Sequence, residues 1–284
     1  MSGGANLAAV PELPETETIA RDLDIEITGR TIVRARVVKA DVLREIAPAA
    51  FARGVAGATI MHCWRRAKLV VVDLSTGDRI VVQPRFTGAL LIDAGSLAGE
   101  ERRYSTLELI LDDGRSLHYR DIRRLGTVAL MSTKRFAQYA GGLGVEPLDP
   151  EFTHAHLSAL LRGSRQAVKK VLMDQRRVAG IGNIYANEAL WRAGIDPSRA
   201  ACDVTHAQAR RLRDSVVDVL RESIAARGTS FRDYRDAAGG RGNFVERLAV
   251  YGRAGQPCVR CGGALIGTHE IDGRSTVLCA HCQE

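Results

Sequence analysis

The stretch CVRCGGALIGTHEIDGRSTVLCAHCQE, residues 258–284, contains two pairs of cysteines, and two residues separate the members of each pair. Cys258 and Cys261 form the first pair, and Cys279 and Cys282 form the second. This spacing is typical of a tetrahedral site in which four thiolates bind one zinc ion. Because four cysteines leave no open coordination position, we expect one structural Zn²⁺ per chain.

The residues between the two cysteine pairs predict a β-hairpin that turns at IDGRS, 271–275. Arg274 lies at its tip, where it is either a basic finger held out by a rigid clip or an arginine in a solvated turn. His281, inside the second pair, is a less favoured alternative ligand. The remaining cysteines, Cys63 and Cys202, are expected to be small buried hydrophobic residues.

Composition limits the classes of protein to which the chain can belong. Of its 284 residues, 45% are hydrophobic and 26% are charged, as in ordinary globular proteins. No apolar run reaches the roughly 18 residues of a membrane span, and the start lacks a secretory signal pattern. We therefore expect a cytoplasmic protein without a membrane partner. The net charge of +7 favours a polyanionic partner, although many basic proteins bind no nucleic acid.

The residues before the cysteine module predict helices from 153 to about 227. Thr153 and Thr205 are plausible N-caps. The helical segments are THAHLSALLRG (153–163), SRQAVKKVLMDQRRV (164–178), NIYANEALWRAG (183–194) and THAQARRLRDSVVDVLRESIAAR (205–227). The glycine-rich DAAGGRGNF, 236–244, is expected to form a loop.

Within this region, QRRVAGIGNIYANEAL (175–190) places two glycines just before a helix that starts near Asn183. Glycines let backbone N–H groups approach a ligand closely, and helix N-termini bind phosphate. The alternative is a helix–turn–helix corner that serves only packing. Neighbouring cations favour nucleic acid: Lys169, Lys170, Arg176 and Arg177.

The first half of the chain predicts one helix, 17–30, followed by a β-sandwich or barrel that ends near residue 131. Its strands are short, rich in β-branched residues and separated by turn signals. The strand segments are TIVRARVV (31–38), ATIMHCWR (58–65), KLVVVDLS (68–75), RIVVQPRF (79–86), ALLIDA (89–94), LELILDD (107–113) and LHYRDIR (117–123). Lys68 is expected at the start of a strand, and Arg123 and Arg124 follow another.

Six motifs together resemble the bacterial formamidopyrimidine-DNA glycosylases of the Fpg/Nei family. They occur in the family's order from Pro11 to Gln283, nearly the whole chain. The motifs are PELPETE (11–17), RRAK (65–68), DIRRLG (121–126), DQRRVAGIGNIYANEALWRAGIDP (174–197), VYGRAGQPC (250–258) and the four-cysteine tail with GRST (273–276).

This resemblance implies an α+β fold of three parts. Residues 11–139 form an N-terminal catalytic β-sandwich domain, followed by a linker, 140–152. Residues 153–246 form a helix–two-turn–helix DNA-binding domain with a lesion-capping loop, and 247–284 form a zinc-finger β-hairpin. Residues 1–10 are an N-terminal extension, interpreted as a start-site artefact. We expect a bacterial monomer that binds damaged double-stranded DNA.

The family excises oxidised purines, 8-oxoguanine and formamidopyrimidines, after flipping the nucleotide out of the helix. Pro11 matches the N-terminal proline that forms a Schiff base with the sugar, after which β,δ-elimination cuts the strand. Glu12 matches the acid that shuttles a proton, and Lys68 matches a lysine that contacts the lesion and its flanking phosphate. Arg274 and Asn183 match phosphate ligands, and Arg165 and Lys169 fall at basic DNA contacts.

Arg123 matches the arginine that fills the gap left by the flipped base and meets the opposite cytosine. Two positions depart from the family. QPRFTG, 83–88, replaces the usual HLGMSG, so Phe86 stands for an inserted methionine, and Leu125 stands for the phenylalanine of RRFG. Both remain apolar wedges. The departure leaves open a Nei-like preference for oxidised pyrimidines or other adducts.

The proline mechanism requires a free secondary amine, which an internal Pro11 lacks. Residue 10 is valine, and a GTG codon encodes valine internally but methionine at a bacterial start. Starting there and removing the methionine would expose Pro11. If residues 1–9 are genuine, a catalytically inactive DNA-binding protein is the alternative. An RNA- or ribosome-binding protein is a further alternative, which the two-domain layout and Glu12 disfavour.

Overall fold

A computed structural model describes residues 10–231 and 233–284, which fall into two compact units. Of the described residues, one unit contains those up to 141 together with 226–243, and the other contains 142–225 and 244–284. In the described part of the chain, no helix combines the length and hydrophobicity needed to cross a bilayer.

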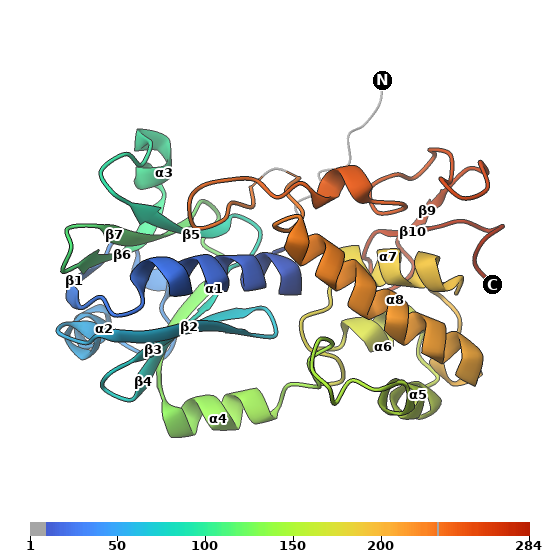
Figure 1. Ribbon diagram of the computed structural model, residues 1–284, viewed down its shortest axis with the longest axis horizontal. Helices are drawn as coiled ribbons and strands as arrows, with labels where there is room; N and C mark the ends of the chain where they lie inside the picture. The colour runs from blue at the N-terminus through green and yellow to red at the C-terminus, as the bar shows by residue number, and fades with distance from the viewer. Residues whose placement is uncertain (1–9, 232) are drawn as a thin grey trace. The chain divides into compact units, whose positions relative to one another are not determined.

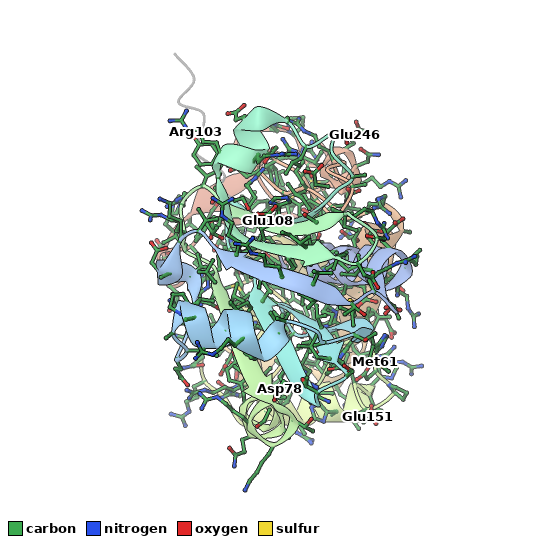
Figure 2. All side chains as sticks on the ribbon, turned by 90° about the vertical axis from the view of Figure 1, so that its left-hand side faces the viewer. Met61, Asp78, Arg103, Glu108, Glu151 and Glu246 are labelled. Carbon is green, nitrogen blue, oxygen red and sulfur yellow. The ribbon has the colours of Figure 1, made fainter. Side chains whose placement is uncertain are left out.

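The first unit is a sandwich of two four-stranded antiparallel sheets, as predicted, with orders β1-β6-β7-β5 and β2-β3-β4-β8 (Figure 1). In Figure 2, Glu108 marks the first sheet, and Met61 and Asp78 mark the second. The strands are β1 (Ile32–Val37), β2 (Ile60–Arg66), β3 (Leu69–Leu74), β4 (Asp78–Gln83), β5 (Gly88–Asp93), β6 (Ser105–Leu111), β7 (Ser116–Asp121) and β8 (Thr127–Ser132). Their inward aliphatic side chains form one buried core.

Helix α1 (Leu13–Ile27) begins earlier than predicted. Glu12 and Glu15 form a capping box, and Pro14 is tolerated because the first helical turn needs no internal N–H partner. The predicted start at residue 17 was therefore wrong: Pro14 belongs to the first turn, and Pro11 comes just before the N-cap. Ile19, Leu23 and Ile27 follow one another at intervals of four and are fully buried in the sandwich core.

The sequence reading missed three shorter helices of this unit and a 3₁₀ turn, because each lies between strands and is brief. They are η1 (Ala40–Val42), α2 (Pro48–Val55), α3 (Gly99–Arg103) and α4 (Thr133–Gly141). Helix α2 contributes Phe51 and Val55, both fully buried, to the sandwich core.

The second unit contains α5 (His154–Arg162), α6 (Val168–Met173), α7 (Asn183–Ala193), α8 (His206–Ala225) and the 3₁₀ turns η2 (Ala201–Asp203) and η3 (Phe244–Arg247). Helix α6 is shorter than the predicted 164–178, because residues 174–182 form the turn that precedes α7. The predicted hairpin is confirmed: β9 (Ile266–Thr268) pairs with β10 (Thr276–Leu278) in antiparallel register.

Segment 226–243 groups by its contacts with the sandwich unit, although the sequence placed it in domain 153–246. Ala237 accepts a hydrogen bond from the backbone N–H of Ile92 on β5 (2.9 Å). Ala237 and Tyr234 are both buried in the sandwich core. The segment is therefore docked on β5 along part of its length.

Candidate active site

Pro11 and Glu12 lie at the start of α1, and both are buried. The backbone N–H of Glu12 donates to Glu15 Oε2 (2.9 Å), and the Glu12 side chain caps the helix N-terminus in return. The pair of candidate catalytic residues is thus held by the helix cap. In the chain as written, the nitrogen of Pro11 is an amide of Val10 and carries no available lone pair.

Glu15 is a residue of this site that the sequence reading assigned only to the helix start. Its other carboxylate oxygen accepts the backbone N–H of Thr229 (2.7 Å), so one side chain joins the base of segment 226–243 to Glu12. A Cβ at Gly228 would lie 3.0 Å from this oxygen, at a φ of +85° that favours glycine. The capping-box spacing in the sequence predicts the contact of Glu15 with Glu12, whereas no sequence pattern predicts its contact with Thr229.

Lys68 lies in the turn between β2 and β3 rather than at a strand start, because Ala67 adopts a φ of +52°. Arg65 links this turn to α1 through one bond to each. Arg65 Nε donates to Glu17 Oε2 (2.8 Å), and Arg65 Nη1 donates to the Ala67 carbonyl (3.1 Å). Burial alone would raise the pKa of Glu17, but the guanidinium groups of Arg65 and Arg21 outweigh it, and the pKa lies below its ordinary value.

Thr16 Oγ1 also reaches the Ala67 carbonyl (3.5 Å), so the first turn of α1 and the turn carrying Lys68 are neighbours. The sandwich unit thus brings Pro11, Glu12 and Lys68 to one region. These three residues are distant in sequence and were grouped beforehand only by the family resemblance.

The structure also brings Phe86 and Arg123 together, from the loops after β4 and β7. Arg123 Cζ lies 4.8 Å from the centroid of the Phe86 ring, which is a cation–π stack. Phe86 adopts a φ of +46°, an uncommon conformation for a side chain of this size. Leu125 lies on the same loop as Arg123 and is 40% exposed. The three residues form what we call the wedge cluster.

Two buried polar residues that the sequence reading missed hold the wedge loops. Thr87 Oγ1 donates to Asp121 Oδ1 (2.6 Å) and accepts the backbone N–H of Arg123 (2.9 Å). The other oxygen of Asp121 accepts the N–H of Gly126 (2.8 Å) and the hydroxyl of Tyr119 (3.3 Å). Asp121 therefore connects both loops, and a residue in the motif DIRRLG acquires a structural role.

In the helical unit, Asn183 is the first residue of α7, directly after the glycine turn. Gly180 adopts a φ of +82°, and its N–H donates to Gln175 Oε1 (2.9 Å). Gln175 Nε2 donates in turn to the Ile181 carbonyl (2.7 Å), so one side chain shapes the turn. Asn183 Nδ2 donates to the carbonyl of Ser275 (2.9 Å), which is next to Arg274.

Lys169 was expected to contact DNA, but it does not lie on the surface of the unit. It is fully buried, and its Nζ donates to the Ser275 carbonyl (2.9 Å) and to Thr276 Oγ1 (2.8 Å). Lys169 and Asn183 thus both hold the hairpin turn that carries Arg274. Arg274 itself is exposed, and so is Arg165, in the connection between α5 and α6.

The four cysteines of the tail converge: their sulfur atoms all lie within 4.8 Å of one another, and His281 is not part of this cluster. The Cys258 and Cys282 sulfurs are 4.0 Å apart, and those of Cys261 and Cys279 are 3.4 Å apart. Tetrahedral zinc–thiolate geometry requires about 3.8 Å between sulfurs. The residues present therefore fit one tetrahedral metal ion.

The charges of the cluster agree with a bound cation. Burial opposes ionisation of Cys258, but the backbone N–H groups of Arg260 and Cys261 bring its pKa to about 6. Burial and the neighbouring sulfurs raise the pKa of Cys282 to about 12. Four thiolates this close repel one another, so the cluster needs a positive ion to ionise fully.

Three family models match the chain: the formamidopyrimidine-DNA glycosylase N-terminal domain over residues 10–128, the formamidopyrimidine-DNA glycosylase H2TH domain over 143–235, and the zinc finger found in FPG and IleRS over 255–284. Among curated relatives, the formamidopyrimidine-DNA glycosylase of Desulfitobacterium hafniense is 40% identical over 276 residues, 96% of this chain and 100% of that protein. The one of Moorella thermoacetica is 43% identical over 258 residues, 90% of this chain and 93% of that protein.

Solved structures agree. The Fpg of Thermus thermophilus is similar with a TM-score of 0.84 and 33% identity, over 96% of this chain and 98% of that one. Lactococcus lactis Fpg in complex with abasic-site DNA is similar with a TM-score of 0.88 and 30% identity, over 96% and 99%. The chain therefore belongs to the formamidopyrimidine-DNA glycosylase family.

Proposed function

We propose that this protein is a bifunctional DNA glycosylase and AP lyase of base excision repair, which removes oxidised purines from double-stranded DNA. The observation that carries the proposal is the contact between the turn that contains Lys68 and the first turn of α1, which follows Pro11 and Glu12. The relatives named above support glycosylase activity. A Lactococcus lactis Fpg variant in complex with Fapy-dG DNA, with a TM-score of 0.89 and 30% identity, supports an oxidised-purine substrate.

In the proposed reaction, the secondary amine of Pro11 attacks C1′ of the damaged nucleotide. The bond from C1′ to the base breaks, and the base leaves with the bonding pair and takes up a proton. Glu12 donates a proton to O4′ as the sugar ring opens, and the nitrogen of Pro11 loses its proton to become an iminium. Successive β- and δ-eliminations then expel the 3′ and 5′ phosphates, and water releases the sugar fragment from Pro11.

This chemistry requires Pro11 to be the N-terminal residue of the working enzyme. We assign the translational start to position 10, where a GTG codon would be read as methionine and then removed. The match to the family's N-terminal domain begins at residue 10, which supports this assignment. Residues 1–9 lie outside the described residues. Fully active native protein that retains residues 1–9 by intact mass would contradict the assignment.

The other predicted residues have roles in binding. Arg274, Asn183 and Arg165 contact phosphates of the damaged strand, and Lys68 contacts the lesion. Arg123 meets the base opposite the lesion.

Phe86 and Leu125 enter the base stack as wedges. Lys169 acts through the hairpin turn rather than on DNA, because its amine is fully buried against Ser275 and Thr276. One zinc ion holds the four-cysteine hairpin, and the enzyme acts as a monomer.

Borohydride trapping on a duplex with 8-oxoguanine opposite cytosine tests the reaction. The full chain of 284 residues and a chain that begins at Pro11 form a matched pair. We expect a covalent adduct only with the shorter chain, while both bind the duplex. Glu12→Gln in the shorter chain should retain binding and lose most of the adduct. Equal trapping by both chains would contradict a role for the Pro11 amine.

A second candidate function is Nei-like excision of oxidised pyrimidines or other adducts. The QPRFTG segment motivates it, because it departs from the family pattern and places the exposed charge of Arg85 beside the wedge cluster. A panel of duplexes with oxidised purines or oxidised pyrimidines separates the two. Higher kcat/KM on thymine glycol than on 8-oxoguanine would establish the second candidate. A catalytically inactive DNA-binding protein would bind every duplex of the panel and trap none.

A further inference from the structure

We propose a second phosphate-binding site on the sandwich unit, which takes a backbone phosphate of the undamaged DNA strand. The site is a hollow of about 290 Å³ beside the loop after β7. Its positively charged lining residues are Lys39, Arg103 and Arg124. The proposal deepens the proposed function and rests on it, because it concerns how the same duplex is held.

Main-chain hydrogen bonds between three segments build the hollow. The N–H groups of Val38 and Lys39, after β1, both donate to the Thr106 carbonyl on β6 (2.9 and 3.0 Å). The N–H of Asp121, at the end of β7, donates to the Tyr104 carbonyl (3.1 Å). These main-chain bonds therefore fix the relative positions of the three backbone segments that line the hollow.

The charge of the hollow favours an anion. Lys39 and Arg103 are exposed, and within residues 10–231 and 233–284 neither forms a salt bridge. Arg124 pairs with Asp41 (2.9 Å), but both side chains are about half exposed, so this pair is open to exchange. Asp121 also lines the hollow, yet its carboxylate already accepts bonds from Thr87 and Gly126.

The size of the hollow selects the ligand. Its volume corresponds to about ten water molecules at roughly 30 Å³ each, which is enough for a phosphodiester with part of a sugar. In the lining, Arg103 already lies over the ring of Tyr104, with Cζ 5.8 Å from the centroid, so this ring face is covered. A phosphate, and not a stacked base, is therefore the chemistry that fits.

The position of the hollow selects the strand. Ile122 and Arg124 line it, and they flank Arg123, which in the proposed function meets the base opposite the lesion. A phosphate held here lies within a few nucleotides of that base, on the strand that carries it. Phosphate contacts fix the register of a protein on the duplex. This site would hold the undamaged strand in place while the damaged nucleotide flips.

The first test uses the double variant Lys39→Gln/Arg103→Gln on an uncleavable duplex with a tetrahydrofuran abasic-site analogue. We expect three- to tenfold weaker binding, and a slope of log K against log salt that is smaller by about 0.9, the value for one neutralised phosphate. Arg53→Gln/Lys134→Gln removes the same charge from exposed positions on α2 and α4. If this control lowers the slope equally, the effect is one of net charge and the proposal is wrong.

The second test replaces single phosphates near the opposite base by neutral methylphosphonates. For one or two linkages on the undamaged strand, we expect wild type to lose three- to tenfold in affinity and the Lys39→Gln/Arg103→Gln variant to lose almost nothing. A loss of affinity that occurs in wild type and not in the variant shows that Lys39 or Arg103 contacts the replaced phosphate directly. Equal losses in both proteins at every linkage, or coupling only with linkages of the damaged strand, would overturn the proposal.

Inorganic phosphate at constant ionic strength separates a DNA site from a site for the free ion. Phosphate that binds the hollow without any coupling to undamaged-strand linkages would also overturn the proposal. Failure of the proposed function is recognised independently. If wild type binds the duplex and shows this coupling but never forms a borohydride adduct, the phosphate site is supported and the proposed enzymatic function is wrong.

Discussion

At the scale of single residues, Phe86 shows how a departure from the family pattern acquires a physical meaning. Its φ of +46° costs about 1 kcal/mol or more for a residue other than glycine. The surrounding structure must therefore hold this conformation. The stack with Arg123 and the two bonds of the neighbouring Thr87 to Asp121 and Arg123 do so.

Phe86→Met should loosen Arg123, because a thioether cannot replace the ring in a cation–π stack that is worth about 0.5–2 kcal/mol. We expect the preference for cytosine over adenine opposite 8-oxoguanine to fall by a few fold. The measurement is the ratio of kcat/KM on the two duplexes. Arg85→Gln is the control, since Arg85 is exposed and bonds to Gln83 (3.2 Å). An equal fall in this control would assign the effect to loop charge.

Glu17 gives a pH-dependent prediction. Its pKa is lower in the folded protein than the ordinary 4.5, so it stabilises the fold above pH 4.5 and ceases to do so as the pH falls through the folded value. Glu17→Gln should lower the free energy of unfolding by about 1 kcal/mol at neutral pH. Urea unfolding should show this difference narrowing below pH 4.5. A difference that stays constant to lower pH would show that Arg65 does not stabilise the ionised carboxylate.

At the scale of elements, polar contacts of Arg227 and Asp236 link the segment 226–243 to α1 and shape the segment itself. Arg227 bonds both Asp22 on α1 (2.6 Å) and Asp236 in the segment itself (2.7 Å). Asp236 in turn accepts the N–H groups of Ala238 (3.1 Å) and Gly240 (2.6 Å). The predicted capping loop is therefore anchored at its base by the ion pairs of Arg227 and by the backbone N–H groups that Asp236 accepts.

Gly242→Ala should push apart the two ends of this segment, because a Cβ there would overlap the carbonyl oxygens of Arg227 and Gly228. We expect faster hydrogen exchange across 226–243 and a several-fold lower rate of excision, with unchanged trapping on a preformed abasic site. Gly239→Asn is the control: Gly239 has open space around its Cα and a φ of +82°, which asparagine tolerates. Normal exchange in the Gly242 variant would show that the segment is not held at this point.

At the scale of the whole molecule, two chemically different centres need separate support. The Pro11 region depends on the sandwich unit, where α1 packs into the sheet core. The Arg274 turn depends on the helical unit, where the cysteine cluster packs with Trp191 and Val250 and where Lys169 and Asn183 hold Ser275. Loss of one support should therefore affect one centre more than the other.

Removal of the metal tests this independence. Chelation should release the hairpin and weaken binding to a tetrahydrofuran duplex by at least tenfold, because Arg274 loses its rigid mount. Zn²⁺ should restore binding, and hydrogen exchange of the sandwich-core amides should not change, because that core shares no residue with the cysteine cluster. Cys202→Ser, outside the cluster, should respond to chelation as wild type does. Undiminished binding after complete metal loss would show that the hairpin holds Arg274 unaided.

Local patterns in the sequence determined much of this protein. The cysteine spacing identified the ligands that converge. Short β-branched segments separated by turn signals predicted a sandwich or barrel, and helical segments were predicted in the second half of the chain. Each of these signals is carried by residues close together in the chain. Helix starts within proline-rich segments and short helices between strands were missed, because packing rather than propensity stabilises them.

Only the tertiary structure decided which side chains share a site. Glu15 reaches Thr229 across a sequence separation of 214, and Lys169 reaches Ser275 across 106. Lys169 is a cation in a basic stretch, and only its fully buried position shows that its amine serves the hairpin. Phe86 meets Arg123 because Thr87 and Asp121 bring two loops together. Buried polar groups must find partners, and the partner available depends on how distant segments pack.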